Sequence, residues 1–205
     1  RPESVRILDS QCRQIDSLPP DRKCVILNSR QSKRPCNRDD WVTATAQAVD
    51  SVIRRELTVI TSTGLNTWEL TAHLVNIGRG RQIIVLPSTD AESIPSLITQ
   101  IIDDFKLDPA RCLFAAPSSD TVPGRRAKDF WPERDLLAVE LADVILPLSI
   151  RPGGNFDRLL NQAAAAGKEI RNDFRVDYRR PVDRVRYDFE KCTLNPSLDN
   201  PHRGY

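Results

Sequence analysis

Three short turns in the sequence combine small residues, hydroxyl groups and arginines, the groups from which anion-binding sites are built. They read Asn28-Ser29-Arg30, Thr61-Ser62-Thr63-Gly64 and Arg151-Pro152-Gly153-Gly154-Asn155. Each follows an apolar run and precedes a predicted helix, directly or after a loop, and the free N–H groups of a helix start favour a negative charge. Guanidinium groups add forked contacts to phosphate. The predicted phosphate or nucleotide cradle consists of Ser29, Arg30, Ser62, Thr63, Gly64, Arg151, Gly153, Gly154 and Asn155.

A second group of arginines lies further along the chain. Arg125 and Arg126 belong to a long polar loop, and Arg134 follows in the next predicted helix. Arginine side chains can follow a nucleic-acid backbone, and an aromatic ring such as Trp131 can stack on a base. We therefore predict Arg125, Arg126 and Arg134 as additional nucleic-acid contacts.

Three other titratable side chains each have two interpretations. His73 is either a general base or a structural residue of a helix. Asp157 is either an acid–base group or a carboxylate that stabilises a helix N-terminus through its charge. Glu69 is either a solvated helix residue or a contact to ribose.

Several classes of function lose support from the sequence. The glycine spacing matches neither the Walker loop nor the G-x-G-x-x-G fingerprint, which disfavours ATP hydrolysis and hydride transfer. Five cysteines are scattered and two histidines are present, so no metal site and no cofactor are predicted. The cysteines are expected to be reduced thiols of a cytoplasmic protein. No apolar run has the length of a transmembrane helix, so no membrane partner is predicted.

The elements that must position the three turns alternate along the chain. Short apolar runs predict strands over 24–27, 57–60, 82–86, 112–116 and 143–148. Apolar residues at helical spacing, with caps and stops, predict helices over 41–55, 67–77, 94–105, 131–141 and 156–166. This alternation predicts an α/β fold with a doubly wound, mostly parallel, Rossmann-like sheet and helices on both faces. Ligands of such sheets bind at the carboxyl ends of the strands, where all three turns fall.

The organisation of the chain follows from composition and charge. Residues 1–20 are predicted to be an N-terminal arm, residues 21–170 the nucleotide- or anion-binding domain, and residues 171–205 a C-terminal extension with a short hairpin or tail. The net charge is only +2. Residues 1–38 nevertheless hold nine Lys and Arg against four Asp and Glu, so the basic excess lies at the start of the chain.

The order of these motifs resembles the DprA/Smf family of DNA-processing proteins. The resemblance rests on Asn28-Ser29-Arg30, the stretch 59–65, Ala72-His73 and the strand 83–86. It continues through 130–135, Gly153-Gly154-Asn155 and the alanine-rich helix up to Gly167, and so covers about residues 22–170. Asn28 stands where the family usually has a glycine, and Glu133-Arg134-Asp135 stands where it has arginine-asparagine-arginine.

The resemblance implies a Rossmann-like fold, shared with the LOG/lysine-decarboxylase-like proteins, and binding of single-stranded DNA. We interpret the chain as a binding module rather than an enzyme, one that holds a nucleotide or single-stranded nucleic-acid phosphate at the sheet edge. One alternative is a LOG-like hydrolase of the nucleotide N-glycosidic bond, with Asp157 or Glu69 as the carboxylate. Another is a protein-interaction scaffold with a vestigial anion site, in which a hairpin over 174–189 pairs with a second copy to give a homodimer.

Overall fold

The core of the structure is one seven-stranded sheet. A computed structural model of the chain describes residues 5–31, 39–86, 92–117 and 131–179. Within them the strand order is β1-β5-β4-β3-β2-β6-β7, with β1 antiparallel to β5 and all other pairs parallel. The strands are β1 (Val5–Leu8), β2 (Lys23–Leu27), β3 (Thr58–Ser62), β4 (Gln82–Val85), β5 (Cys112–Pro117), β6 (Val144–Pro147) and β7 (Glu169–Ile170).

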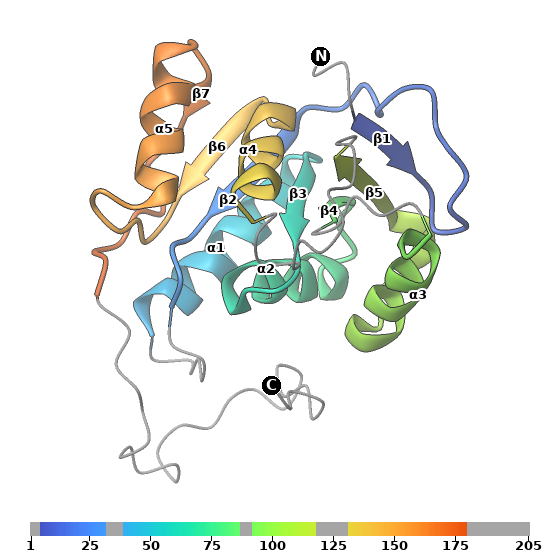
Figure 1. Ribbon diagram of the computed structural model, residues 1–205. Coiled ribbons are helices and arrows are strands. Elements are labelled where there is room, and N and C mark those ends of the chain that lie inside the picture. Colours follow the sequence, from blue (N-terminus) through green and yellow to red (C-terminus); the bar gives the residue numbers. More distant parts are fainter. Residues whose placement is uncertain (1–4, 32–38, 87–91, 118–130, 180–205) are drawn as a thin grey trace, which may run out of the picture.

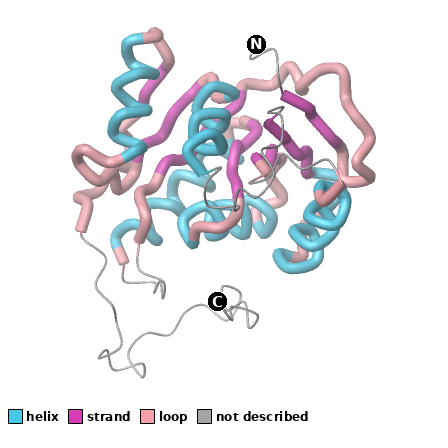
Figure 2. Tube along the Cα trace, in the orientation of Figure 1, coloured by secondary structure: helices cyan, strands magenta, loops and turns pink. Residues whose placement is uncertain are grey.

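Helices cover both faces of this sheet (Figures 1 and 2). They are α1 (Asp40–Arg54), α2 (Asn66–Ile77), α3 (Ile94–Phe105), α4 (Trp131–Leu141) and α5 (Asn155–Ala165), and a short 3-10 turn, η1 (Pro109–Arg111), precedes β5. Alternate residues of each strand point to opposite faces. Val25 and Leu27 of β2 therefore pack with α4 and α5, whereas Cys24 and Ile26 pack with α1. The predicted α/β, doubly wound, mostly parallel fold is confirmed.

The strand order reverses beside β2. Strands β3, β4 and β5 follow one another on one side of β2, and β6 and β7 lie on the other side. The segments that leave β2 and β6 therefore separate at a topological switch point, where open α/β sheets form their ligand crevice. The turns at Ser29 and at Gly153 both belong to this point.

The N-terminal segment differs from the predicted arm. Val5–Leu8 form the edge strand β1, in register with β5 from Val5 opposite Pro117 to Leu8 opposite Phe114. Ile7 and Leu8 are buried and join the cores on opposite faces of the sheet. Arg6 interrupts the apolar run in the sequence, so this short strand has no clear apolar pattern.

The segment after β7 follows the surface of the sheet and α1. Val176 N–H donates to the Leu148 carbonyl oxygen over 3.2 Å, and Phe174 and Val176 pack against the cluster that contains α1. Residues 171–179 contain no strand. The second half of the predicted hairpin, residues 185–189, and the tail 194–205 lie outside the described residues.

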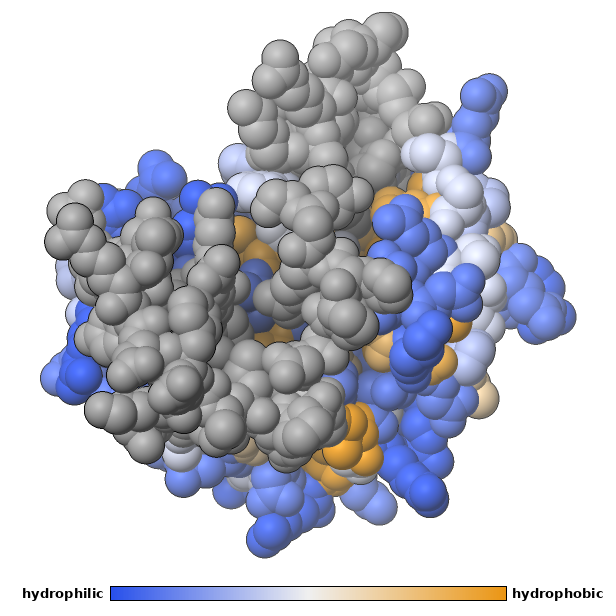
Figure 3. All heavy atoms as spheres, turned by 90° about the horizontal axis from the view of Figure 1, so that it is seen from below, coloured by the Kyte–Doolittle hydropathy of each residue, from blue (hydrophilic) through white to orange (hydrophobic). Residues whose placement is uncertain are grey.

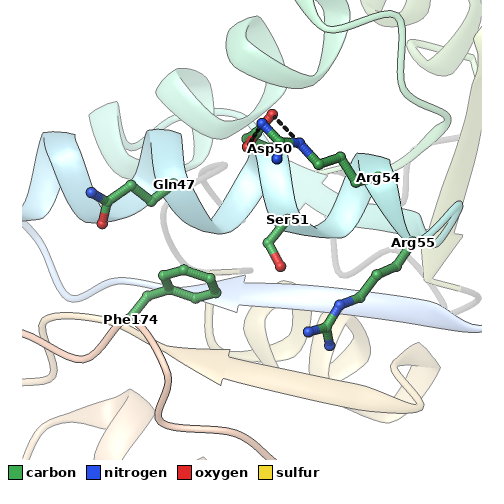
Figure 4. Close-up of a pocket in the computed structure, with 6 residues that line it drawn as sticks. All are labelled: Gln47, Asp50, Ser51, Arg54, Arg55 and Phe174. Carbon is green, nitrogen blue, oxygen red and sulfur yellow. Dashed lines mark hydrogen bonds and ion pairs between the residues drawn. The ribbon is translucent and has the colours of Figure 1, made fainter.

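Phe174 also borders a shallow depression beside α1 (Figure 4). The other side is lined by Gln47, Asp50, Ser51 and Arg54 of α1 and by Arg55, which follows the helix. Arg54 forms an ion pair of 2.8 Å with Asp50. None of the predicted site residues lines this depression.

The face of the molecule in Figure 3 has no large apolar area outside the grey parts. In the view of Figure 3, the hydrophobic areas outside the grey parts are small and separate. No helix among the described residues has the length and apolar content that crossing a bilayer requires.

Two cysteines are part of the core. Cys24 and Cys112 are buried, and both are free thiols, as is Cys12. Burial raises the pKa of Cys24 to about 12 and that of Cys112 to about 11, because a thiolate is poorly solvated there.

We expect Cys24 and Cys112 to resist alkylation by iodoacetamide in the native protein at pH 8, since the thiolate is the reactive form. Cys12 is only partly buried and should react faster. Peptide mapping by mass spectrometry, with a urea-unfolded sample as the control, measures each rate. Native labelling of Cys24 as fast as in urea would contradict the buried position of β2.

Candidate functional site

The turns after β2 and β6 are joined by hydrogen bonds. Ser29 N–H donates to the Ser149 carbonyl oxygen over 3.0 Å, and Arg151 N–H donates to Ser29 Oγ over 2.8 Å. The buried side chain of Asn28 donates to Thr45 Oγ1 of α1 over 3.2 Å and accepts from Ser149 N–H over 3.3 Å. These contacts bring the predicted residues Ser29 and Arg151 together and leave both the Arg30 and the Arg151 side chains exposed.

The turn after β3 starts later than its sequence predicts. Thr61 and Ser62 belong to the central strand β3 and are fully buried. The Thr61 hydroxyl donates to the Trp68 carbonyl oxygen over 2.9 Å, and the Ser62 hydroxyl donates to the Val85 carbonyl oxygen over 2.6 Å. The predicted phosphate contact from Ser62 is therefore corrected, because its hydroxyl is used inside the sheet.

Arg134 is the buried charge of the site. Its side chain has 0% exposure, and its Nη1 donates to the Thr63 carbonyl oxygen at the end of β3 over 2.8 Å. Its Nε and Nη2 donate to Asp135 Oδ1 over 3.0 and 2.7 Å. The predicted direct contact between Arg134 and nucleic acid is also corrected, because the guanidinium is buried and donates to groups of the protein itself.

Asp135 connects this guanidinium to the start of α5. Its other oxygen, Oδ2, accepts from Asn155 Nδ2 over 3.0 Å. Burial raises the pKa of Asp135, while the neighbouring Arg134, the hydrogen bond from Asn155 and the nearby Trp68 indole act in the opposite direction. The Asn155 amide, which the sequence predicts to face a phosphate, therefore donates to the Asp135 carboxylate of α4.

Trp131, the first residue of α4, has two guanidinium groups over its ring. Arg30 Cζ is 5.7 Å and Arg134 Cζ is 5.4 Å from the centre of its ring. Both distances are within the range of cation–π attraction. Gly64 lies against this stack, and a Cβ at that position would be 3.6 Å from Arg134 Nη1 and 3.8 Å from Trp131 Nε1. The φ of +87° at Gly64 further favours glycine.

The N–H groups of the two glycine turns already have acceptors in the chain. Gly153, with φ of +67°, donates to Asp157 Oδ2 over 2.8 Å. Gly64 donates to Glu69 Oε1 over 3.3 Å. In each turn the carboxylate comes from the first turn of the helix that follows. Asp157 and Glu69 therefore act as helix-start carboxylates, and a phosphate would have to replace them to reach these N–H groups.

The remaining predicted residues divide between the site and other places. Thr63, Gly154 and Asn155 lie at the same edge, through the Arg134 contact and the turn that starts α5. Arg125 and Arg126 lie outside the described residues.

Trp41 and Trp68 are 6% and 2% exposed and pack in the core, and Trp68 makes an edge-to-face contact with Phe156 at 5.8 Å. His73 is a half-buried residue of α2, and its role stays a prediction.

The sequence reasoning missed Asp135 as a partner of this site. In the sequence, Asp135 appears only as a departure from the family's arginine-asparagine-arginine, and neighbouring residues of a helix do not normally face each other. The signal was the Trp131 and Arg134 pair at helical spacing i, i+3, which places both on one face of α4. Among the described residues, no cluster of His, Cys, Asp and Glu could hold a metal ion.

Comparison with known proteins was made by sequence and by structure. No family model matches the sequence, and no curated protein matches it. In structure, the chain is similar to DNA processing protein A from Helicobacter pylori, with a TM-score of 0.55 and 13% identity over 86% of this chain and 76% of that chain. The chain has the fold of DNA processing protein A.

The same protein from a second organism shows the same likeness, and a third structure matches less well. DNA processing protein A from Streptococcus pneumoniae has a TM-score of 0.55 and 14% identity over 73% of this chain, which spans 49% of that protein. The Moco carrier protein from Chlamydomonas reinhardtii has a TM-score of 0.45 and 11% identity over 73% of this chain and 74% of that chain. The predicted resemblance to DprA is therefore confirmed for the fold.

We expect the replacement Arg134→Met to destabilise the protein at pH 7.5 by about 3–5 kcal/mol, because it leaves the buried Asp135 carboxylate without its counter-ion. The double replacement Arg134→Met with Asp135→Asn should recover part of this loss. Urea unfolding measures both. Equal free energies of unfolding for the Arg134→Met variant and the wild type would show that the pair is not coupled.

The loss of stability in Arg134→Met should depend on pH. An acid whose pKa is raised by folding stabilises the fold most below its ordinary pKa of 3.8, and this contribution is lost as the pH rises through the raised value. Removing Arg134 leaves the burial unopposed by its charge. The destabilisation relative to wild type should therefore be smaller at pH 4.5 than at pH 7.5.

Proposed function

We propose that this domain binds single-stranded nucleic acid at the carboxyl edge of its sheet, with Trp131 as a stacking platform and Arg30 and Arg151 as phosphate contacts. The observation that carries the proposal is the stack of Arg30, Trp131 and Arg134 beside the Gly64 turn. An aromatic ring next to arginines at a strand edge is suited to a base and its phosphate.

The two guanidinium groups over Trp131 differ in their burial. Arg134 is buried and held by Thr63 and Asp135, so it can hold the ring in place. Arg30 is exposed, and its described contact with the ring is a cation–π contact. A base can therefore replace Arg30 on the indole, and the released guanidinium can then contact the adjacent phosphate.

The glycine turns play a smaller part in this proposal than the sequence predicts. Their N–H groups are held by Asp157 and Glu69, and Arg151 N–H is held by Ser29. Phosphate recognition consequently falls to the exposed guanidinium groups rather than to the backbone. The basic excess of residues 1–38, around Arg30, favours such a polyanion.

The similar structure from Helicobacter pylori supports the choice of ligand. DNA processing protein A from that organism binds single-stranded DNA. The alternative of a nucleotide hydrolase needs Asp157 or Glu69 as a free carboxylate near the anomeric carbon, and both hold glycine N–H groups. A cytoplasmic location and a homodimer stay predictions.

We expect Trp131→Ala to weaken binding of a fluorescein-labelled (dT)20 oligonucleotide by about 1–3 kcal/mol, the usual value of a base–aromatic stack. Trp131→Phe should retain most of the affinity because it keeps a ring at this position. Fluorescence anisotropy at low salt measures both variants. Wild-type affinity in Trp131→Ala would overturn the stacking role.

Arg30→Ala and Arg151→Ala should each weaken binding and lower the slope of log K against log salt by about 0.7, as expected for one lost phosphate contact with a single strand. Arg54→Ala is the matched control, since Arg54 is an exposed arginine of α1 that is paired with Asp50. A salt slope that changes equally in all three variants would favour a general effect of net charge over a defined contact.

A further inference from the structure

A continuous path of polar contacts leads from the start of α5 to the stacking platform. Asn155 Nδ2 donates to Asp135 Oδ2 over 3.0 Å, and Asp135 Oδ1 accepts from Arg134 Nη2 over 2.7 Å. Arg134 in turn lies 5.4 Å from the centre of the Trp131 ring. The path joins the turn after β6 to the turn after β3, because Arg134 also donates to the Thr63 carbonyl oxygen.

The middle of this path has little freedom. Arg134 and Asp135 are 0% and 6% exposed, so water cannot replace a lost partner at low cost. The groups that face the Asp135 carboxylate come from three helices: Arg134 from α4, Asn155 from α5 and Trp68 from α2. Asn155 differs from the others because it belongs to the element that the Gly153 turn starts.

We propose that Asn155 is a positioning residue, which holds Asp135 and through it Arg134, so that the face of Trp131 is fixed beside Gly64. The inference rests on the proposed function, since it gives Trp131 the task of stacking a base. It goes beyond that function by assigning part of the affinity to a side chain that acts through two others.

Replacing Asn155 by aspartate tests this path directly. Asn155→Asp removes the N–H donor and places a second carboxylate against Asp135. The two carboxylates repel each other at pH 7.5, which pushes Asp135 away from Arg134. Binding of (dT)20 should weaken about tenfold, the effect of losing one hydrogen bond to a charged group.

The matched control is Asn161→Asp. Asn161 is an exposed residue on the same helix, so this variant adds the same charge to α5 without approaching Asp135. Its affinity should stay within about twofold of wild type, as expected for a distant exposed charge. Equal weakening in Asn155→Asp and Asn161→Asp, or wild-type affinity in Asn155→Asp, would overturn the inference.

A pH profile separates positioning from damage to the fold. Near pH 5 the paired carboxyl groups can share one proton, which restores a donor between them. The affinity of Asn155→Asp, relative to wild type at the same pH, should therefore recover. Asn155→Ser shortens the side chain without adding a charge, so it should weaken binding at both pH values. Loss of affinity in Asn155→Asp that does not recover, or wild-type affinity in Asn155→Ser, would overturn the inference.

A measurement without nucleic acid keeps this inference separate from the proposed function. Trp41 and Trp68 are almost fully buried, whereas Trp131 is partly exposed. Iodide quenching of tryptophan fluorescence should therefore increase in Asn155→Asp and Asn155→Ser, but not in Asn161→Asp. The increase should vanish when Trp131→Phe is added.

The two readouts fail in different ways. A wild-type protein that does not bind (dT)20 contradicts the proposed function, and the quenching data then decide the inference alone. Unchanged quenching in both Asn155 variants would show that Asn155 does not position Trp131.

Discussion

A guanidinium group that is removed from water must find acceptors for its N–H groups, and in this protein that requirement organises the carboxyl edge of the sheet. Arg134 meets it with the Thr63 carbonyl oxygen and the Asp135 carboxylate, and so ties the start of α4 to the end of β3. The carboxylate is itself buried and takes a further donor from α5. One buried charge thus makes the positions of two helices and one turn depend on each other.

The sheet supplies the frame in which this contact is possible. The reversal of strand order between β2 and β6 opens the edge at which α4 and α5 both begin. At the same edge, the Arg151 N–H donates to Ser29 Oγ and so joins the turn after β6 to the turn after β2. Arg30 and Arg151 are therefore carried on turns that are fixed by the sheet, and both residues are exposed.

Much of this architecture was predictable because buried parallel strands are continuous apolar runs. The runs that became β2, β4, β5 and β6, and the helices between them, were located to within about two residues. Thr61 and Ser62 were misassigned to a turn, because hydroxyl residues are typical of turns but can also donate to carbonyl groups inside a sheet. Val5–Leu8 were missed because a single strand with one arginine has no periodicity of its own. Arg134 was expected at the surface, and only the spatial proximity of Thr63 and Asp135 explains its burial.

The carboxylates of Glu69 and Asp157 occupy the two glycine turns at which an anion could bind. Each positively polarised glycine turn is already neutralised by an anion that is covalently part of the protein. A phosphate that enters such a turn is exchanged for a carboxylate, so the free energy gained is only the difference between two similar contacts. The conformation of these two helix starts therefore does not require bound phosphate.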